Sequence, residues 1–415
     1  LAGWTLEFRM APEEVSGAAA GAVPWQLLAE GSVSIVNNEL GTFDPTLLLN
    51  GIYELRLVAS DLAGRESVSD IVTVVVDGNM KVGLFTLSFE DLSVPLAGIP
   101  IQVVRTYDSR AAIAGRGGDF GIGWTMSLKD LRLSKNRALG NKWRQEITGF
   151  IGGMGIPRYE MRPVQDRIIT VTLPDNTVHR FKVVFNPSAQ TGVPIVSGQL
   201  AFEPLPGTYG TLAVEGDTTV VLTGTIPYYD WLGGQSVFSG IVDLMDPLTG
   251  MDFEPALYRF TTEDGTAFIV HESQGLKKVL DRNGNEVIYA HSGIYHSSGQ
   301  SVQFVRDGQD RITHILDPDG NALSYGYDTN GNLASFTDRT TNTTTFAYTP
   351  ILLHSTTPSL HFLSDIFDPR GVRAVRSEYD ESGRLISQTD ADGNPIVFTH
   401  DIENRREIVT DRLGN

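Results

Sequence analysis

The sequence predicts an all-β protein, and three observations carry this prediction. Residues 306–415 repeat a short pattern at a nearly constant spacing. Within the repeats, bulky and small residues alternate with the period of two that is typical of β-strands. The 43 glycines and 20 prolines are spread along the chain, which indicates many turns and not a flexible linker. No amphipathic helix of useful length is visible, so we expect little helix.

Length, charge and cysteine content limit the classes to which the chain can belong. Its 415 residues are enough for two to three domains of ~100 to 200 residues each. A formal charge of −18 and the lack of a Lys/Arg run predict that nucleic acid is not a partner. Without cysteine there is no disulfide, no thiol nucleophile and no thiolate metal site. No apolar run approaches the ~18 residues of a membrane-spanning segment.

The two ends of the sequence predict a fragment or a processed piece of a longer protein. The chain begins at Leu1 without a methionine or a signal-peptide pattern. It stops at Asn415, where the next strand of the repeat is due. We therefore expect the protein to continue beyond Asn415.

Residues 1–78 are predicted to form a small separate β-domain. Along one predicted strand, Tyr53 and Leu55 share a face while Glu54 and Arg56 share the other, so one side of the strand is expected to be buried. This strand and the next alternating stretch are similar to the last two strands of bacterial immunoglobulin-like modules. The resemblance implies an Ig-like β-sandwich. The alternative is an irregular β segment of the main body.

Residues 79–265 show no repeat and are predicted to be a β-rich region that precedes and plugs the repeats. A strand, a glycine-rich loop over 115–123 and a second strand anchored by Trp124 are expected first. Further short strands are predicted at 168–174, 177–185, 257–262 and 266–271.

Residues 266–415 are predicted to be a series of β-hairpins that join into one curved sheet. A Tyr-Asp step, or its equivalent, recurs with spacings of 21, 21, 31 and 21 residues. We expect Asn330 and Gly331 to supply the two positive-φ positions of a tight hairpin turn. Insertions into the repeat are expected around residues 292–299, in a Ser/Gly loop, and within residues 350–364. The residues that mark the repeat, all predicted to be structural, are Tyr327, Asp328, Gly331, Asp317, Gly320, Asn321, Tyr379, Asp380, Gly383, Asp390, Gly393 and Asn394.

This pattern resembles the YD repeats of Rhs polymorphic toxins, teneurins and the C component of bacterial insecticidal toxin complexes. The resemblance is carried by residues 327–333 and 379–394. In that family the hairpins add edge to edge into a sheet that spirals into a hollow shell around a toxic C-terminal polypeptide. The resemblance implies a secreted or cell-surface location. It also implies that the main partner is the protein's own C-terminal region, while the segment that ends the shell in this family is not visible here.

An Asp-x-Asp-Gly-Asn motif at 317–321, echoed at 390–394, matches the first five positions of an EF-hand calcium loop. The sixth position, which needs glycine, is Ala322 in one copy and Pro395 in the other. A strand and not a helix is expected to follow. We therefore expect the aspartates to close their own turns and predict no metal and no cofactor.

No set of residues predicts an enzyme. Of eight histidines only His291 and His296 are close in sequence, and they lie in a predicted Ser/Gly loop. No Gly-x-Ser-x-Gly elbow is present, and the glycine-rich loop lacks the Lys-Ser/Thr of a phosphate cradle. Fifty carboxylates leave a glycosidase pair open without singling one out. We predict no catalytic residue.

The sequence thus favours a structural role, as the wall of a shell that would encapsulate a C-terminal polypeptide. The alternative is a surface adhesin that binds glycans or proteins through the Ig-like module and the repeat sheet. Recurring aromatic residues could stack on sugars, but their periodicity fits cross-strand packing better. A carbohydrate-active enzyme is a third, weaker possibility.

Overall fold

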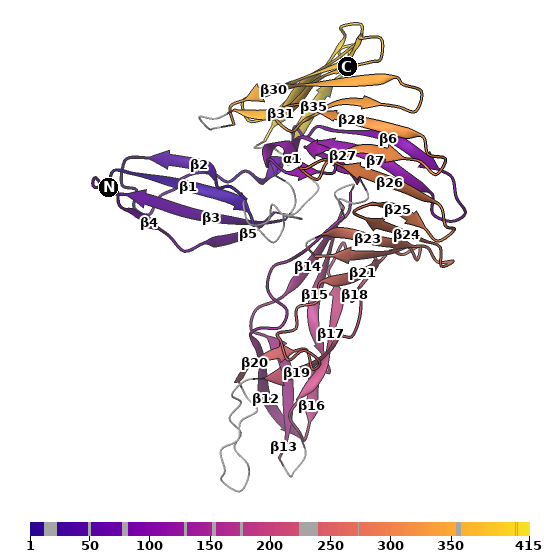
Figure 1. Ribbon diagram of the computed structural model, residues 1–415. Coiled ribbons are helices and arrows are strands. Elements are labelled where there is room, and N and C mark those ends of the chain that lie inside the picture. The colour runs from indigo at the N-terminus through magenta and orange to yellow at the C-terminus, as the bar shows by residue number, and fades with distance from the viewer. Residues whose placement is uncertain are drawn as a thin grey trace. The chain divides into compact units, whose positions relative to one another are not determined.

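The computed structural model describes most of the chain (Figure 1). The residues outside this description are 12–22, 49–50, 77–81, 128–130, 152–154, 175–176, 224–239, 273, 354–357, 403 and 405. The described residues form strands β1 to β35, with one short α-helix, α1 (Ser109–Ile113), and one 3₁₀ helix, η3 (Pro45–Leu47). The predicted all-β class is confirmed. Among these residues no helix has the length and apolar character needed to cross a membrane.

The chain divides into two compact units. Unit 1 comprises residues 1–130, 173–177 and 283–415, and unit 2 comprises residues 131–172 and 178–282. The boundaries expected near residues 78 and 265 stay predictions. Each unit is described by itself.

In unit 1, the described residues of the range 1–76 form the N-terminal module. Its antiparallel sheet has the order β2 (Gln26–Gly31), β1 (Gly3–Met10), β3 (Gly51–Ser60) and β4 (Glu66–Val68), and β5 (Val72–Val76) also pairs with β3. The predicted single buried side of β3 is not confirmed, because Tyr53 is buried but so is Ile52 on the opposite face, and residues 54–60 are half-buried. Glu54 and Arg56 pair with charged residues of β1. The described residues of the module form one sheet, so the Ig-like sandwich stays a prediction.

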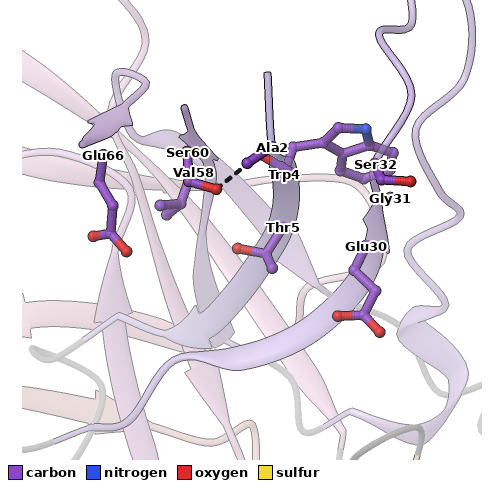
Figure 2. Close-up of a pocket in the computed structure, with 10 residues that line it drawn as sticks. Ala2, Trp4, Thr5, Glu30, Gly31, Ser32, Val58, Ser60 and Glu66 are labelled. Atoms are coloured by element: carbon purple, nitrogen blue, oxygen red, sulfur yellow. Dashed lines mark hydrogen bonds between the residues drawn. The ribbon is translucent and has the colours of Figure 1, made fainter. Parts of the chain in front are cut away.

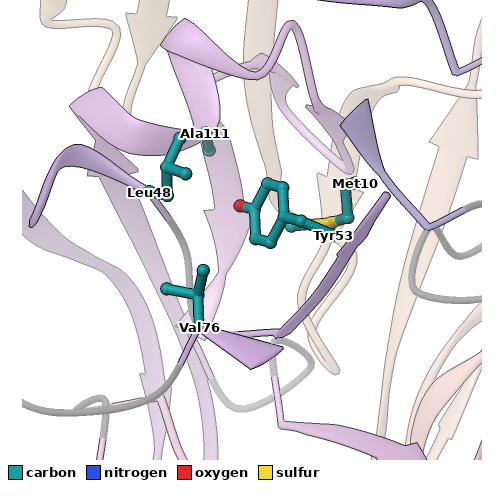
Figure 3. Close-up of a cluster of buried hydrophobic side chains, with 5 residues drawn as sticks. All are labelled: Met10, Leu48, Tyr53, Val76 and Ala111. Carbon is teal, nitrogen blue, oxygen red and sulfur yellow. The ribbon is translucent and has the colours of Figure 1, made fainter. Parts of the chain in front are cut away.

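The N-terminal module packs on α1 through a small apolar cluster (Figure 3). The cluster contains Met10, Leu48, Tyr53 and Val76 of the module, and Ala111 of α1. Asp108 caps α1 by accepting a hydrogen bond from the backbone N–H of Arg110. This helix lies within the segment that leads into the predicted glycine-rich loop.

Residues 86–126 of unit 1 form a covering segment. It is a three-stranded sheet in the order β10 (Trp124–Met126), β7 (Ile101–Asp108) and β6 (Thr86–Val94). The predicted loop contains two short paired strands, β8 (Gly117–Gly118) and β9 (Gly121–Ile122). Alternate side chains of β7 are buried, from Ile101 to Tyr107.

The repeat sheet of unit 1 runs from β24 to β35 in chain order, and each strand pairs antiparallel with the next. The predicted edge-to-edge joining of the hairpins is confirmed for this run. Its strands are β24 (Glu286–Ala290), β25 (Gly293–His296), β26 (Ser301–Arg306), β27 (Ile312–Leu316), β28 (Ala322–Tyr327), β29 (Leu333–Thr337), β30 (Thr343–Ile351), β31 (Ser359–Phe367), β32 (Arg373–Tyr379), β33 (Leu385–Asp390), β34 (Pro395–Asp401) and β35 (Arg406–Thr410).

The loop predicted at residues 292–299 is wrong, because the strand β25 occupies residues 293–296. Serine and glycine suggested a loop, but Ile294 is buried and the backbone bonds to strands on both sides. The second predicted insertion lengthens β30 and β31, and part of it lies outside the described residues.

Unit 2 contains a nine-stranded sheet in which strand order departs from chain order. The order is β11 (Arg132–Lys135), β14 (Ile168–Thr172), β15 (Val178–Asn186), β17 (Ser197–Pro204), β19 (Thr219–Thr223), β20 (Gly240–Met245), β12 (Trp143–Ile151), β13 (Ile156–Pro163) and β16 (Ala189–Thr191). A second run pairs β18 (Thr211–Val214), β21 (Leu257–Thr261), β22 (Ala267–His271) and β23 (Gly275–Leu280) in that order. The four short strands predicted before and after residue 200 correspond to β14, β15, β21 and β22.

Candidate functional site

The predicted signature aspartates all close the same kind of turn. The Asp328 N–H donates to the carbonyl of Asn332 at 3.0 Å, and the Gly331 N–H donates to the carbonyl of Asp328 at 3.2 Å. The Asp328 Oδ1 accepts from the N–H groups of Asn330 and Asn332. These four contacts recur in the turns that begin at Asp317, Asp380 and Asp390. The expectation that the aspartates bond their own backbone is confirmed.

The predicted two-residue turn at Asn330 and Gly331 is wrong. Gly331 has a φ of 85°, but Asn330 is absent from the described non-glycine residues with positive φ, which are Asn37, Lys142, Asp310 and Thr341. The turn is a three-residue hairpin loop with glycine in the left-handed position. Aspartate at the first position of a turn and glycine at the fourth are typical of this arrangement.

The turn carboxylates are satisfied within the repeats. Asp317, at the start of the calcium-loop-like motif, accepts from two backbone N–H groups, from the amide of Asn321 and from Arg339 at 3.1 Å. Hydrogen bonds from the side chain and then the backbone of Asn342 lower the pKa of Asp338 to about 2. Both carboxylates are therefore directed at their own turns.

A ladder of tyrosine hydroxyls joins each repeat to the one before it. Tyr327, Tyr348 and Tyr379 donate to the carbonyls of Ile312, Leu333 and Leu363, at 2.5 to 2.8 Å. The donor and acceptor are separated by 15, 15 and 16 residues. Burial raises the pKa of all three tyrosines, so each hydroxyl keeps its proton and remains a donor.

His400, which takes the place of the repeat tyrosine, continues the tyrosine ladder. Its Nε2 lies 2.7 Å from the carbonyl of Leu385, which is fifteen residues earlier. Because a carbonyl only accepts, the imidazole donates. The acceptor residues were not predicted from the sequence. The signal that could have found them is the apolar residue that directly follows the Asp turns, as at Ile312, Leu333 and Leu385.

The covering segment packs on the aromatic face of the repeat sheet. The Trp124 Nε1 donates to the Tyr348 hydroxyl at 2.8 Å. The Tyr107 hydroxyl donates to the carbonyl of His361 and accepts from the N–H of Leu363. Tyr325 contacts Phe336 across the strands, as predicted, but it also packs on Phe120 of the covering segment. This face of the sheet is therefore partly covered by the chain itself.

Arg105 of β7 forms the most buried ion pair of this contact. Its Nε and Nη2 donate to the two oxygens of Asp91 at 2.9 and 3.0 Å, and both side chains are 1% exposed. The guanidinium also lies 4.7 Å from the ring centre of Trp124 and 5.1 Å from that of Phe346. The ring of Phe346 comes from β30, so the pair links the covering segment to the repeats.

Comparison with known proteins gives a family match at the end of this sheet. Residues 379–415 match the family model of the RHS repeat. This segment is similar to the RHS repeat. A search of curated proteins found no match.

Two solved structures of Tc toxins are similar to the chain over much of its length. One is the TcdB2-TccC3 protein without its hypervariable C-terminal region, with 11% identity and a TM-score of 0.27, covering 86% of this chain and 20% of that one. The other is the Photorhabdus luminescens Tc holotoxin pore, with 10% identity and a TM-score of 0.22, covering 86% of this chain and 26% of that one. The chain thus spans about a fifth to a quarter of those chains.

The turn and tyrosine contacts of the matched segment also occur before it in the chain. Two turns with these contacts precede the match, at Asp317 and Asp328. Two rungs of the ladder, meaning single hydrogen bonds from a tyrosine hydroxyl to an earlier carbonyl, also precede it, at Tyr327 and Tyr348. The repeating unit is thus present from about β26 onward in the described structure.

The two neighbouring histidines do not form a shared site. His291 is exposed and lies 3.4 Å from Asp310, whereas His296 is buried and its Nδ1 lies 2.8 Å from the hydroxyl of Ser298. Among the described residues no cluster of three or more histidines and carboxylates has the geometry to hold a metal ion.

An open pocket lies at one end of the sheet of the N-terminal module (Figure 2). Figure 2 shows Glu66 and Glu30 on opposite sides of the view, with Thr5 between them and the indole of Trp4 beside Gly31 and Ser32. The Ala2 N–H donates to the carbonyl of Ser60 at 2.7 Å and fixes the start of β1 there. The lining of the pocket contains two carboxylates, those of Glu30 and Glu66, beside the apolar side chains of Trp4 and Val58.

Proposed function

We propose that this chain forms part of the wall of a β-shell that encloses a polypeptide, in a secreted or cell-surface protein. The observation that carries the proposal is the unbroken pairing from β24 to β35, which ends in a segment similar to the RHS repeat. Strands bonded on both sides leave no free backbone edge within the wall, and free edges are where foreign strands pair. The proposed role is structural, without a catalytic residue or a cofactor.

The covering segment supports the idea of a plug. It covers part of one face of the repeats with buried aromatic side chains and with the Arg105–Asp91 pair. A wall closed by its own chain keeps water from that face. The enclosed partner would be the C-terminal region beyond Asn415, as the resemblance to YD-repeat proteins implies.

Protease protection of the natural full-length protein tests this proposal. We expect a C-terminal polypeptide to survive digestion while the sheet is folded. It should become sensitive in a Leu333→Asp variant, because a charge in that buried position opens the wall. Val372→Asp, at an exposed position, is the matched control and should leave the protection intact. Equal digestion of the polypeptide in all three proteins would contradict enclosure.

The alternative function is adhesion, and the open pocket of the N-terminal module is the place where a ligand would bind. Glu30 and Glu66 could accept hydrogen bonds from the hydroxyls of a glycan. Glycan-array binding that is lost in a Glu30→Gln/Glu66→Gln variant would support an adhesin. Such binding, without a protected C-terminal polypeptide, would replace the shell proposal.

A further inference from the structure

Among the described residues of unit 1, the turns that begin at Asp61, Asp307 and Asp380 end in arginine, and one of these three arginines bonds outside its own turn. In the turns that begin at Asp61 and Asp307, the Nε of Arg65 or Arg311 donates to the carboxylate of its own turn, at 2.7 and 2.8 Å. Turns that end in asparagine likewise return the amide to their own aspartate. Arg384, in the turn that begins at Asp380, does not.

Arg384 instead reaches the N-terminal module and its connection to the covering segment. Its guanidinium donates to the Asp44 carboxylate, to the carbonyl of Val82 and, at 3.0 Å, to the Thr46 hydroxyl. The residue is 2% exposed. A guanidinium is removed from water at a high cost unless it is paired, so these three acceptors account for its burial.

The connecting residue Gly83 fits closely against this arginine. The carbonyl of Gly83 accepts from the N–H of Leu385 at 3.0 Å, and its own N–H donates to Glu407 at 3.4 Å. A β-carbon at Gly83 would lie 2.5 Å from the Arg384 Cβ, and the φ of Gly83 is 74°. Residues 82–83 therefore attach to the beginning of β33 and to β35.

We propose that the N-terminal module is a clasp on the repeat sheet and that Arg384 determines which turn the clasp holds. The apolar cluster with Ala111 holds the module against α1, which itself contacts β31, but none of the residues of the cluster belongs to a turn of the repeats. Arg384 adds the selection, because it stands where other turns carry an asparagine or an arginine that bonds inward. The clasp holds the first turn of the segment that matches the RHS repeat, since Asp380 and Arg384 lie within the matched residues. This inference does not depend on whether the shell encloses a polypeptide.

Spin-label distances test the clasp in the complete chain. The protein has no cysteine, so a thiol-reactive spin label attaches only at introduced cysteines. The two introduced cysteines are Thr73→Cys on the module and Asp392→Cys on the repeats. Both positions are exposed. We expect a narrow distance distribution in the otherwise native chain and a broad one in Arg384→Asn. Asparagine occupies this position in several other turns, so the turn itself should persist in the variant.

Two further variants separate the clasp from the turn. Asp44→Ala removes the acceptor on the module and leaves the repeat turn untouched, and it should broaden the distribution as Arg384→Asn does. Arg311→Asn is the matched control, because Arg311 bonds its own turn, and the distribution should stay narrow. A narrow distribution in Arg384→Asn or in Asp44→Ala, or a broad one in the parent chain, would overturn the proposal.

Discussion

The repeat sheet of unit 1 and the nine-stranded sheet of unit 2 are both antiparallel, but different contacts stabilise them. In the repeat sheet, strand order follows chain order, and one turn and one tyrosine contact recur from unit to unit. In unit 2, β12 lies between β20 and β13, and its buried Gln145 bonds both backbone groups of Ile195, fifty residues away. A contact that recurs allows an effect measured at one repeat to be transferred to another, whereas a contact that occurs once must be measured by itself.

The largest loss of stability is expected from a core substitution in unit 2. Trp143 is fully buried, packs on Phe185 and donates its indole N–H to the carbonyl of Leu139 at 2.7 Å. Replacing it with alanine should lower the free energy of unfolding by about 3–5 kcal/mol. Hydrogen exchange in urea should show the loss in unit 2 peptides and not in the repeats. Phe150→Ala, at a residue 68% exposed, should change stability by less than about 0.5 kcal/mol. Equal loss of protection in both units would remove the distinction between them.

Loss of one rung of the tyrosine ladder should have a smaller effect, of similar size in each repeat. Tyr348→Phe leaves the carbonyl of Leu333 and the indole N–H of Trp124 without this partner, which should cost about 1–3 kcal/mol. Tyr327→Phe should cost somewhat less, because no tryptophan donates to its hydroxyl. Urea midpoints measure the difference. Tyr295→Phe is the control, since this side chain is 37% exposed. Unrelated values for the rungs would show that the repeats are not equivalent.

A stabilising substitution tests the preference for glycine at the left-handed position of these turns. Thr341 occupies the left-handed position that is usually glycine in these turns, with a φ of 67°, although it is β-branched. Thr341→Gly should raise the free energy of unfolding by roughly 0.5–1 kcal/mol, because relief of the strain exceeds the added entropy of the unfolded chain. Thermal unfolding gives the sign. Thr340→Gly should destabilise instead, since the Thr340 hydroxyl bonds Asp338 and Asn342.

The smallest expected effect is a loss of folding stability at low pH. The pKa of Asp338 is about 2 in the folded chain, below the value of roughly 3.9 of an unfolded aspartate. The ionised carboxylate therefore stabilises the fold above the unfolded pKa, and this contribution is lost as the pH falls toward 2. Backbone hydrogen bonds from Asn394 and Asn415 lower the pKa of Asp390 and Asp411 in the same direction. Urea midpoints between pH 5 and 2.5 should fall less steeply in Asp338→Asn. Parallel curves would show that this turn does not contribute.

The sequence predicted the repeats well because their contacts are local. Alternation and the positions of aspartate and glycine identified the hairpins, and the Asp328 turn lies entirely within five residues. The turn type was missed because the Asn330-Gly331 dipeptide is a strong signal for a different hairpin, whereas the aspartate at the first position decides the outcome.

The contacts of the covering segment could not be predicted from periodicity. Tyr325 donates to Asp91 across 234 residues, and Trp124 donates to Tyr348 across 224. Neither pair follows from a spacing in the chain. Arg384 belonged to a recognised repeat motif, but nothing in the motif shows that its guanidinium would leave its own turn.

The tyrosine ladder gives the assembly of the sheet a direction. Each hydroxyl reaches a carbonyl fifteen or sixteen residues earlier, so every unit is completed by its successor. In a chain emerging from the ribosome, the carbonyl of Leu333 would remain open until Tyr348 had left the exit tunnel. Folding of the wall would then proceed behind synthesis by about one repeat, from the amino to the carboxyl end.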